Sequence, residues 1–281
     1  MADITAIILT RNEEKYIEDC IASVRRIVKR IVVVDSFSDD RTVELAKKSG
    51  AEVYQHEFYN HAKQYMYAVK KADVKTKWIL RIDADERLTK DSAKELDKLC
   101  NANEKTDVNG IILRFYNLFL GKPMYHGGMY PWKKLSVYKT GKGNIEDRNM
   151  DEHIILTCGR TIEAKKDSKH LAFRGLTFFT NKCNWYSTRE AMDYFESIKT
   201  TSSNASLKTR LKMNVYYKLP LGIRSWAYYI YRYYFRLGFL DGKEGKIFAF
   251  LHAYWYRFLV DAKIYEHEKL KTEFEPPGAL K

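Results

Sequence analysis

Short apolar runs alternate with helical segments over the first 82 residues, and this alternation restricts the fold more than any other feature of the chain. Strand-like runs are expected at residues 5–10, 30–35, 52–56 and 78–82. Apolar residues recur at helical spacing between them, over residues 16–27, 42–49 and 60–72. Strands that alternate with helices in this way pair in parallel and are covered by helices on both faces. We therefore predict an α/β fold with a doubly wound sheet.

Two carboxylates follow the fourth expected strand. Asp83 and Asp85 stand one residue apart after the apolar run 78–82. In extended backbone, side chains at positions i and i+2 point to the same side. Ligands bind at the carboxyl ends of the strands in α/β sheets, and carboxylate oxygens suit Mg²⁺ or Mn²⁺ carrying a diphosphate. Asp85 is therefore a candidate metal ligand, although an Asp-x-Asp pair also occurs in ordinary turns.

Polar residues end the first two expected strands as well. Asp35 can accept a hydrogen bond from a uracil or guanine ring N–H or from ribose hydroxyls. The turn Thr10-Arg11-Asn12-Glu13 can line a base, with Glu13 on the ribose. The alternatives are helix capping after Asp35, which we favour for Asp39 or Asp40, and a polar turn with an acidic first helical turn.

Two further groups are candidates for substrate contacts. Lys63 and Gln64, with His61, open the third helix and could bind phosphate, or form only a solvated face. Tyr130, Trp132 and Lys133 combine aromatic faces, which stack on sugars, with a cation. They fall in residues 122–139, which are rich in Gly, Pro, aromatic residues and Lys, and which we expect to form an acceptor-side loop.

Asp151, Glu152 and His153 precede an apolar run at 154–156. Attack of a hydroxyl on a sugar's anomeric carbon requires a base, and either carboxylate could serve. His153 could bind the metal or a phosphate. The alternative is a polar entry into a strand.

Composition narrows the class of protein. A hydrophobic content of 45% excludes general disorder, and a net charge of +13 suits an anionic partner such as a phosphorylated substrate or anionic lipid. No nucleic-acid-binding module is recognisable, so we expect no nucleic-acid partner. The four cysteines are widely spaced, which argues against a zinc site.

The C-terminal third is rich in aromatic residues, among them many of the chain's 21 Tyr. Such residues are typical of a membrane interface, and also of packing between helices. With no secretion signal or transmembrane run, we expect a cytoplasmic protein that is peripheral on the inner face of the cell membrane.

Taken together, these motifs resemble family-2 glycosyltransferases of the GT-A fold, in the bacterial lipopolysaccharide-core, exopolysaccharide and capsule branch. The resemblance lies in residues 7–14, 34–42, 82–86, 150–154, 238–245 and 256–263. It implies that Asp35, Asp83 and Ala84 bind the nucleoside, that Asp85 binds Mn²⁺ or Mg²⁺, and that Glu152 is the base. Asp151 stands where that branch often has His, so the choice between Asp151 and Glu152 stays open.

The resemblance also implies a domain plan. A GT-A catalytic domain is expected over 1–170, with a nucleotide-binding half at 1–100 and an acceptor-side half at 101–170. Residues 171–281 are expected to form a helical region that associates with a membrane or forms a homo-oligomer.

The implied function is inverting transfer of a sugar from a nucleotide-diphosphate donor, with a UDP-sugar favoured, to a lipid-linked or lipopolysaccharide-type glycan. Alternatives are a catalytically inactive, membrane-docked assembly protein and a sugar-phosphate nucleotidyltransferase. The latter normally opens with a Gly-rich phosphate loop, and Thr10–Glu13 contains no Gly.

Overall fold

The computed structural model describes residues 1–146, 153–200, 219–271 and 274. The chain divides into two compact units. Unit 1 comprises residues 1–117 and 131–172, and unit 2 comprises residues 118–130 and 173–281. The predicted roles of Asp151 and Glu152 therefore concern positions outside the described residues.

Four parallel strands begin unit 1. They are β1 (Ile4–Thr10), β2 (Arg30–Asp35), β3 (Glu52–Gln55) and β4 (Trp78–Arg81), in the order β3-β2-β1-β4. All four were predicted from the apolar runs. In the β1–β2 register Thr10 lies opposite Asp35, so the polar ends of these strands meet at one edge of the sheet.

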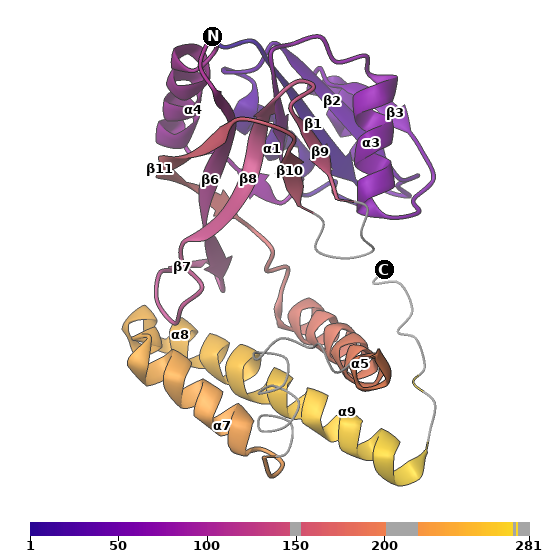
Figure 1. The fold of residues 1–281 in the computed structure, drawn as a ribbon, viewed down its shortest axis with the longest axis vertical. Coiled ribbons are helices and arrows are strands. Elements are labelled where there is room, and N and C mark those ends of the chain that lie inside the picture. The colour runs from indigo at the N-terminus through magenta and orange to yellow at the C-terminus, as the bar shows by residue number, and fades with distance from the viewer. Residues whose placement is uncertain (147–152, 201–218, 272–273, 275–281) are drawn as a thin grey trace. The chain divides into compact units, whose positions relative to one another are not determined.

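Helices cover both faces of this sheet (Figure 1). One hydrophobic core lies beneath α1 (Ile17–Val24), α2 (Thr42–Lys48) and α4 (Lys90–Ala102). A second core lies beneath α3 (His61–Lys71) on the opposite face. The side chains that fill these cores recur at three- and four-residue spacing along each helix, for example Ile17, Cys20, Ile21 and Val24 in α1. The predicted α/β class is confirmed.

The sheet continues beyond β4 with mixed strand directions. β8 (Trp132–Lys139) pairs antiparallel with β4, followed by β6 (Val108–Phe119), β11 (Arg160–His170) and β5 (Glu86–Arg87). β7 (Lys122–Met124) pairs with β6. β9 (Gly143–Ile145) and β10 (Ile154–Leu156) form a separate small sheet.

The expectation of a loop over residues 122–139 was wrong, because this range contains β7 and β8. In β8, Ser136, Val137 and Tyr138 are all buried. The strand lies between β4 and β6. Its backbone polar groups are therefore paired on both sides, and its residues need not alternate between polar and apolar. Because the strand contains lysines at 133, 134 and 139, its composition does not indicate a buried strand.

Unit 2 is mainly helical, as expected. Its elements are α5 (Leu176–Thr200), α7 (Ile223–Ile230), the π-helical η2 (Tyr231–Phe235), the 3₁₀ turn η3 (Gly238–Asp241), α8 (Gly242–Phe248), the π-helical η4 (Ala249–Trp255) and α9 (Tyr256–Leu270). Ala191 of α5 packs on Val260 and Ile264 of α9. In the part of the chain that the structure describes, no helix is long and apolar enough to cross a bilayer.

Candidate functional site

Asp35, at the end of β2, is fully buried, and its carboxylate is occupied by local hydrogen bonds. Thr10 Oγ1 donates to it from 3.1 Å and the Ser38 backbone N–H from 2.8 Å. Gln55 Nε2 lies 3.5 Å away. Asp35 therefore fixes the loop that follows β2 to the ends of β1 and β3. A direct contact between Asp35 and a nucleoside stays a prediction.

The loops after β1 and β2 are fastened to each other. Asn12 has a left-handed backbone (φ 55°), its N–H donates to Ser38 Oγ at 2.9 Å, and its Oδ1 accepts from the Asp39 N–H at 2.9 Å. The Glu13 N–H donates to Thr42 Oγ1 at 2.7 Å. These contacts hold the predicted base-lining turn in one conformation, a condition for binding a ligand without ordering the loop first.

Asp40 holds the start of α2. Its carboxylate accepts hydrogen bonds from the backbone N–H groups of Thr42 and Glu14, at 3.0 and 3.1 Å. Burial raises the pKa of Asp40, but the hydrogen bonds from Thr42 and Glu14 outweigh it and lower the pKa from its usual value. The N-cap residue of α2 is Arg41, whose side chain makes no capping hydrogen bond, and it is the preceding Asp40 that accepts from the first helical N–H.

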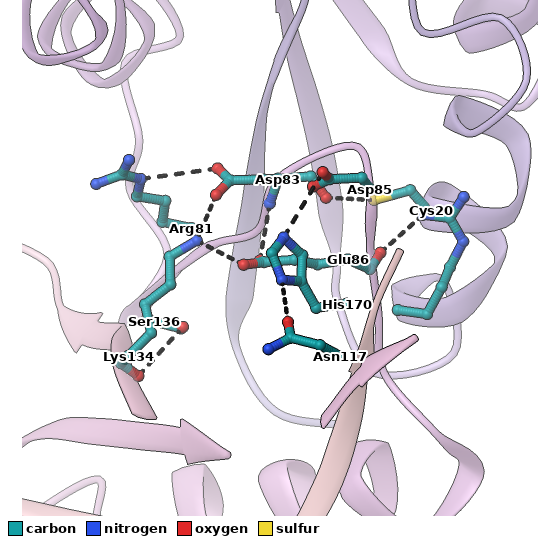
Figure 2. Close-up of polar contacts among 10 residues, drawn as sticks. Cys20, Arg81, Asp83, Asp85, Glu86, Asn117, Lys134, Ser136 and His170 are labelled. Atoms are coloured by element: carbon teal, nitrogen blue, oxygen red, sulfur yellow. Dashed lines mark hydrogen bonds and ion pairs between the residues drawn. The ribbon is translucent and has the colours of Figure 1, made fainter. Parts of the chain in front are cut away.

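The turn after β4 is built around Asp83 and Glu86 (Figure 2). The Asp83 N–H donates to Glu86 Oε2 at 3.0 Å, and the Glu86 N–H donates to the Asp83 carbonyl at 2.9 Å. Glu86 is fully buried, whereas Asp83 is partly exposed. The turn thereby presents Asp83 and Asp85, while Glu86 is kept inside as its support.

Lys134 of β8 neutralises this acidic turn. Its Nζ lies 2.6 Å from Asp83 Oδ2 and 2.8 Å from Glu86 Oε1, and its side chain is 11% exposed. Arg81 Nε lies 3.9 Å from Asp83 Oδ1. Burial raises the pKa of Asp83, but Lys134 and Arg81 outweigh it and hold the pKa well below its usual range. Asp83 is therefore an anion held between two cations at neutral pH.

Asp85 faces His170, which ends β11 (Figure 2). Asp85 Oδ2 lies 3.6 Å from His170 Nε2, and the Asp85 carbonyl accepts from the Leu171 N–H at 2.8 Å. His170 Nδ1 lies 2.7 Å from Asn117 Oδ1. That amide oxygen can only accept, so Nδ1 carries the proton, and in the neutral ring Nε2 presents a lone pair towards Asp85.

This arrangement fits a divalent cation. A histidine that binds a metal usually donates its other ring N–H to an oxygen, as His170 does to Asn117. The Asp85 carboxylate lies 3.6 Å from His170 Nε2 and supplies a second possible ligand for the cation. Within the described ranges no group of three or more His, Cys, Asp or Glu gathers as a complete metal cage. Two protein ligands, completed by substrate oxygens and water, would suit Mg²⁺ or Mn²⁺.

His153, the other predicted metal ligand, is exposed where β10 begins, and its metal role stays a prediction. His170 was missed by the sequence analysis. The only signal there is a histidine at the end of a polar strand, and its approach to Asp85 depends on the distant pairing of β11 with β5 and β6.

The predicted phosphate residues separate into two kinds. Gln64 is buried, donating to Ser36 Oγ at 3.0 Å and to the His56 carbonyl at 3.1 Å. It therefore fixes the start of α3. Lys63 is exposed, and its ammonium lies 5.7 Å from the centre of the Tyr59 ring. Gln64 is neutral and buried, whereas Lys63 presents an exposed positive charge to which an anionic ligand could bind.

The three predicted acceptor residues also differ. Trp132 packs in unit 1, with its ring 5.3 Å from that of Phe115 and 4.7 Å from that of His170. Trp132 therefore supports the histidine that faces Asp85. Lys133 Nζ is 2.7 Å from Glu163 Oε2 in a half-exposed pair. Tyr130 belongs to unit 2, where its ring lies 5.0 Å from that of Tyr125.

Comparisons with known proteins agree with this picture. The family model described as "Glycosyl transferase family 2" matches residues 5–187. A lipopolysaccharide core biosynthesis glycosyltransferase, LpsC of Rhizobium meliloti, is 29% identical over 99% of this chain and 97% of its own length. An uncharacterized glycosyltransferase of Rickettsia felis is 28% identical over 95% of this chain and 90% of its own.

Solved structures give shorter matches. Mannosyl-3-phosphoglycerate synthase from Rubrobacter xylanophilus matches with a TM-score of 0.36 and 21% identity, over 41% of each chain. Glucosyl-3-phosphoglycerate synthase from Mycobacterium tuberculosis, in complex with Mn²⁺, uridine diphosphate and glucosyl-3-phosphoglycerate, has a TM-score of 0.34 and 19% identity. The second match covers 42% of this chain and 44% of that one. The chain thus spans less than half the length of either solved protein.

Proposed function

Since this chain belongs to glycosyl transferase family 2, we propose that it transfers a sugar, with inversion, from a nucleotide-diphosphate donor to a lipid-linked or lipopolysaccharide-type glycan. The observation that carries the proposal is the acidic turn after β4, with Asp83 clamped by Lys134 and Asp85 facing His170. The full-length similarity to LpsC supports a glycan of the cell surface as acceptor.

The donor's nucleoside is assigned to the ends of β1, β2 and β4. Thr10 and Asp35 meet there in register, and Asp83 follows β4, the other strand beside β1. A carboxylate held ionised, such as Asp83, can accept the ring N–H of uracil or guanine, and of the two we favour a UDP-sugar as donor. Lys63 would add a cation for the phosphates.

Asp85 and His170 are the residues that would hold Mn²⁺ or Mg²⁺. A cation bound there supplies positive charge for the diphosphate that leaves in the reaction. The chain's own contribution is positional: Asn117 fixes the tautomer of His170, and Trp132 packs against its ring. The general base that takes the acceptor hydroxyl's proton is assigned to Glu152 or Asp151.

Thermal-shift binding of UDP, GDP and CMP, with Mn²⁺ or with EDTA, tests this proposal. We expect UDP to raise the melting temperature only with Mn²⁺, because both Asp85 and the diphosphate are needed to hold the cation. Asp85→Asn should abolish the shift, and His170→Gln should weaken it. Asp107→Asn, which alters an exposed acid that pairs with Arg160, is the matched control and should behave as the wild type.

Equal stabilisation by UDP in EDTA, or in the Asp85→Asn variant, would contradict the metal assignment. No stabilisation by any nucleotide would contradict the donor site as a whole. It would then favour the inactive, membrane-docked assembly protein.

A further inference from the structure

Unit 2 exposes a large apolar surface along the consecutive elements α7, η2, η3, α8 and η4. We call it the docking face and define it by Trp226, Ile230, Tyr234, Phe235, Leu240 and Phe250. Their exposed fractions are 51%, 41%, 56%, 76%, 54% and 47%. Single exposed apolar residues are ordinary on a protein surface, but a group of this size marks an interaction site.

Four of the six residues of the docking face are linked by helical spacing or by ring contacts. Trp226, Ile230 and Tyr234 follow one another at four-residue spacing along α7 and η2, so they lie on one side of the helix. The Trp226 ring lies 4.9 Å from that of Tyr254, and Tyr254 lies 5.4 Å from Phe250. Side chains of α7 and η4 thus meet along this face, in agreement with their neighbouring ribbons in Figure 1.

Three charged residues of the same elements are buried instead. Arg224, Arg232 and Asp241 are all at most 7% exposed. Arg224 pairs with Asp261 of α9, and Asp241 accepts from the backbone N–H and the ring of His126. Globular proteins normally bury apolar residues and expose charges. Here the segment buries three charged side chains and exposes aromatic rings, as expected where the outside is not water alone.

The exposed charges of this segment are mainly positive. Arg236, Lys243 and Lys246 are exposed, whereas Glu244 is partly covered and lies 3.4 Å from Lys122 Nζ. The whole chain carries a net charge of +13. Two copies meeting through this face about a two-fold axis would bring like charges together. Anionic headgroups would instead pair with them, while the rings enter the acyl boundary.

We propose that the docking face binds an anionic lipid bilayer, with helices lying in the plane of the interface. No described helix is long and apolar enough to span the membrane, which agrees with this shallow mode. The proposal rests on the proposed function, because it identifies the surface through which the protein would reach a lipid-linked acceptor. Lipid binding itself does not require catalytic activity.

Co-sedimentation of the full chain with phosphatidylglycerol–phosphatidylcholine vesicles tests the proposal. We expect binding that increases with the phosphatidylglycerol fraction and weakens in high salt. Phe235→Ser with Leu240→Ser should lower the partition coefficient about tenfold or more, because two apolar side chains no longer enter the bilayer. Lys243→Gln with Lys246→Gln should lower it about tenfold at low salt.

Matched controls are available for both pairs. Tyr265→Ser with Leu270→Ser changes two exposed, largely apolar side chains of α9, outside the docking face. Lys94→Gln with Lys98→Gln removes two exposed lysines of α4. Both controls should keep wild-type binding. The Mn²⁺–UDP thermal shift of every variant is measured in parallel, so that loss of lipid binding is separated from loss of folding and from failure of the donor site.

Three results would overturn the proposal. The wild type could fail to bind vesicles at any composition, or the Phe235–Leu240 and Lys243–Lys246 double variants could both bind as well as their controls. Sedimentation velocity could instead show a dimer that Phe235→Ser with Leu240→Ser dissociates, which would assign the face to contacts between two copies of the chain.

Discussion

Lys134 is the residue on which the acidic turn after β4 most depends. Its ammonium contacts both Asp83 and Glu86 and is almost buried. Burial lowers the pKa of Lys134, but the two carboxylates outweigh it and raise the pKa above the usual value. Lys134 therefore stays protonated at neutral pH, and it balances two carboxylates that would otherwise repel each other.

We expect Lys134→Met to lower the free energy of unfolding by about 3 kcal/mol at pH 7, because it leaves the buried Glu86 and the partly exposed Asp83 without their cation. The lowered pKa of Asp83 means that its stabilising contribution is complete above its unfolded pKa and is lost as pH falls through the folded value. The difference in unfolding free energy between wild type and Lys134→Met should therefore become smaller at acidic pH. Urea unfolding at pH 7 and in acid measures both effects.

Lys133→Met is the matched control for this change. Lys133 stands next in the chain and pairs with Glu163, but both side chains are well exposed. Its loss should change stability by less than about 1 kcal/mol. A Lys134 variant that is no less stable than the Lys133 variant would show that the clamp contributes nothing measurable.

Sequence and structure differ in an instructive way at this site. Asp83 and Asp85 could be predicted because they follow an apolar run that had to be a buried strand. Lys134 and His170 come to the same turn from β8 and β11, which are distant in the chain. Whether Lys134 and His170 reach the turn depends on the order and register of the strands. Neither β8 nor β11 has a local sequence pattern that determines which strands it pairs with.

At the scale of elements, the βα units were predictable, whereas β5, β8 and β11 were not. β1 to β4 are apolar runs that end in polar residues, and the helices between them show helical periodicity. β8 and β11 carry many lysines, and β5 has only two residues. Such strands are specified by neighbours that supply backbone hydrogen bonds, a property of the assembled sheet rather than of the segment.

The contact of α8 with η3 gives a prediction at this scale. A Cβ at Gly245 would lie 2.4 Å from the Gly238 carbonyl oxygen and 2.7 Å from Asp241 Cβ. Gly245→Ala should therefore force α8 away from η3 and lower the free energy of unfolding by about 1–3 kcal/mol. The measurement is urea unfolding followed by circular dichroism.

Lys246→Ala is the control for Gly245→Ala, because Lys246 is the exposed neighbour in the same helix. Its effect should stay within about 0.5 kcal/mol. Equal stabilities of the two variants would mean that the backbone contact between α8 and η3 is looser than the structure has it.

At the scale of the whole molecule, the two units have differently built interiors. Unit 1 has two apolar cores on the faces of one sheet. Unit 2 has a small apolar core between α5 and α9, and it also contains the partly buried His252. Acid should therefore destabilise unit 2 through a group whose neutral form the fold requires.

His252 of η4 is that group. Its ring stacks at 5.1 Å on Phe248, and its Nδ1 is buried without a hydrogen-bond partner among the described residues. Burial, together with Arg232 and Arg257, lowers the pKa of His252 to about 4. The unfolded chain binds the proton near pH 6.5, so stability is complete above that pH and falls as the solution is acidified towards pH 4.

His252→Phe should remove this dependence, because phenylalanine fills the same stacked position without binding a proton. Relative to wild type, the variant should gain about 2 kcal/mol of unfolding free energy between pH 7.5 and pH 5. Urea unfolding at both pH values, followed by circular dichroism, measures the change. His267→Phe, on α9 of the same unit, is the control for removing a histidine as such. If the His252 variant and wild type lost stability in parallel on acidification, His252 would have to be protonated or solvated in the folded chain. A neutral ring stacked on Phe248, with its Nδ1 buried, would then be the wrong description of this part of unit 2.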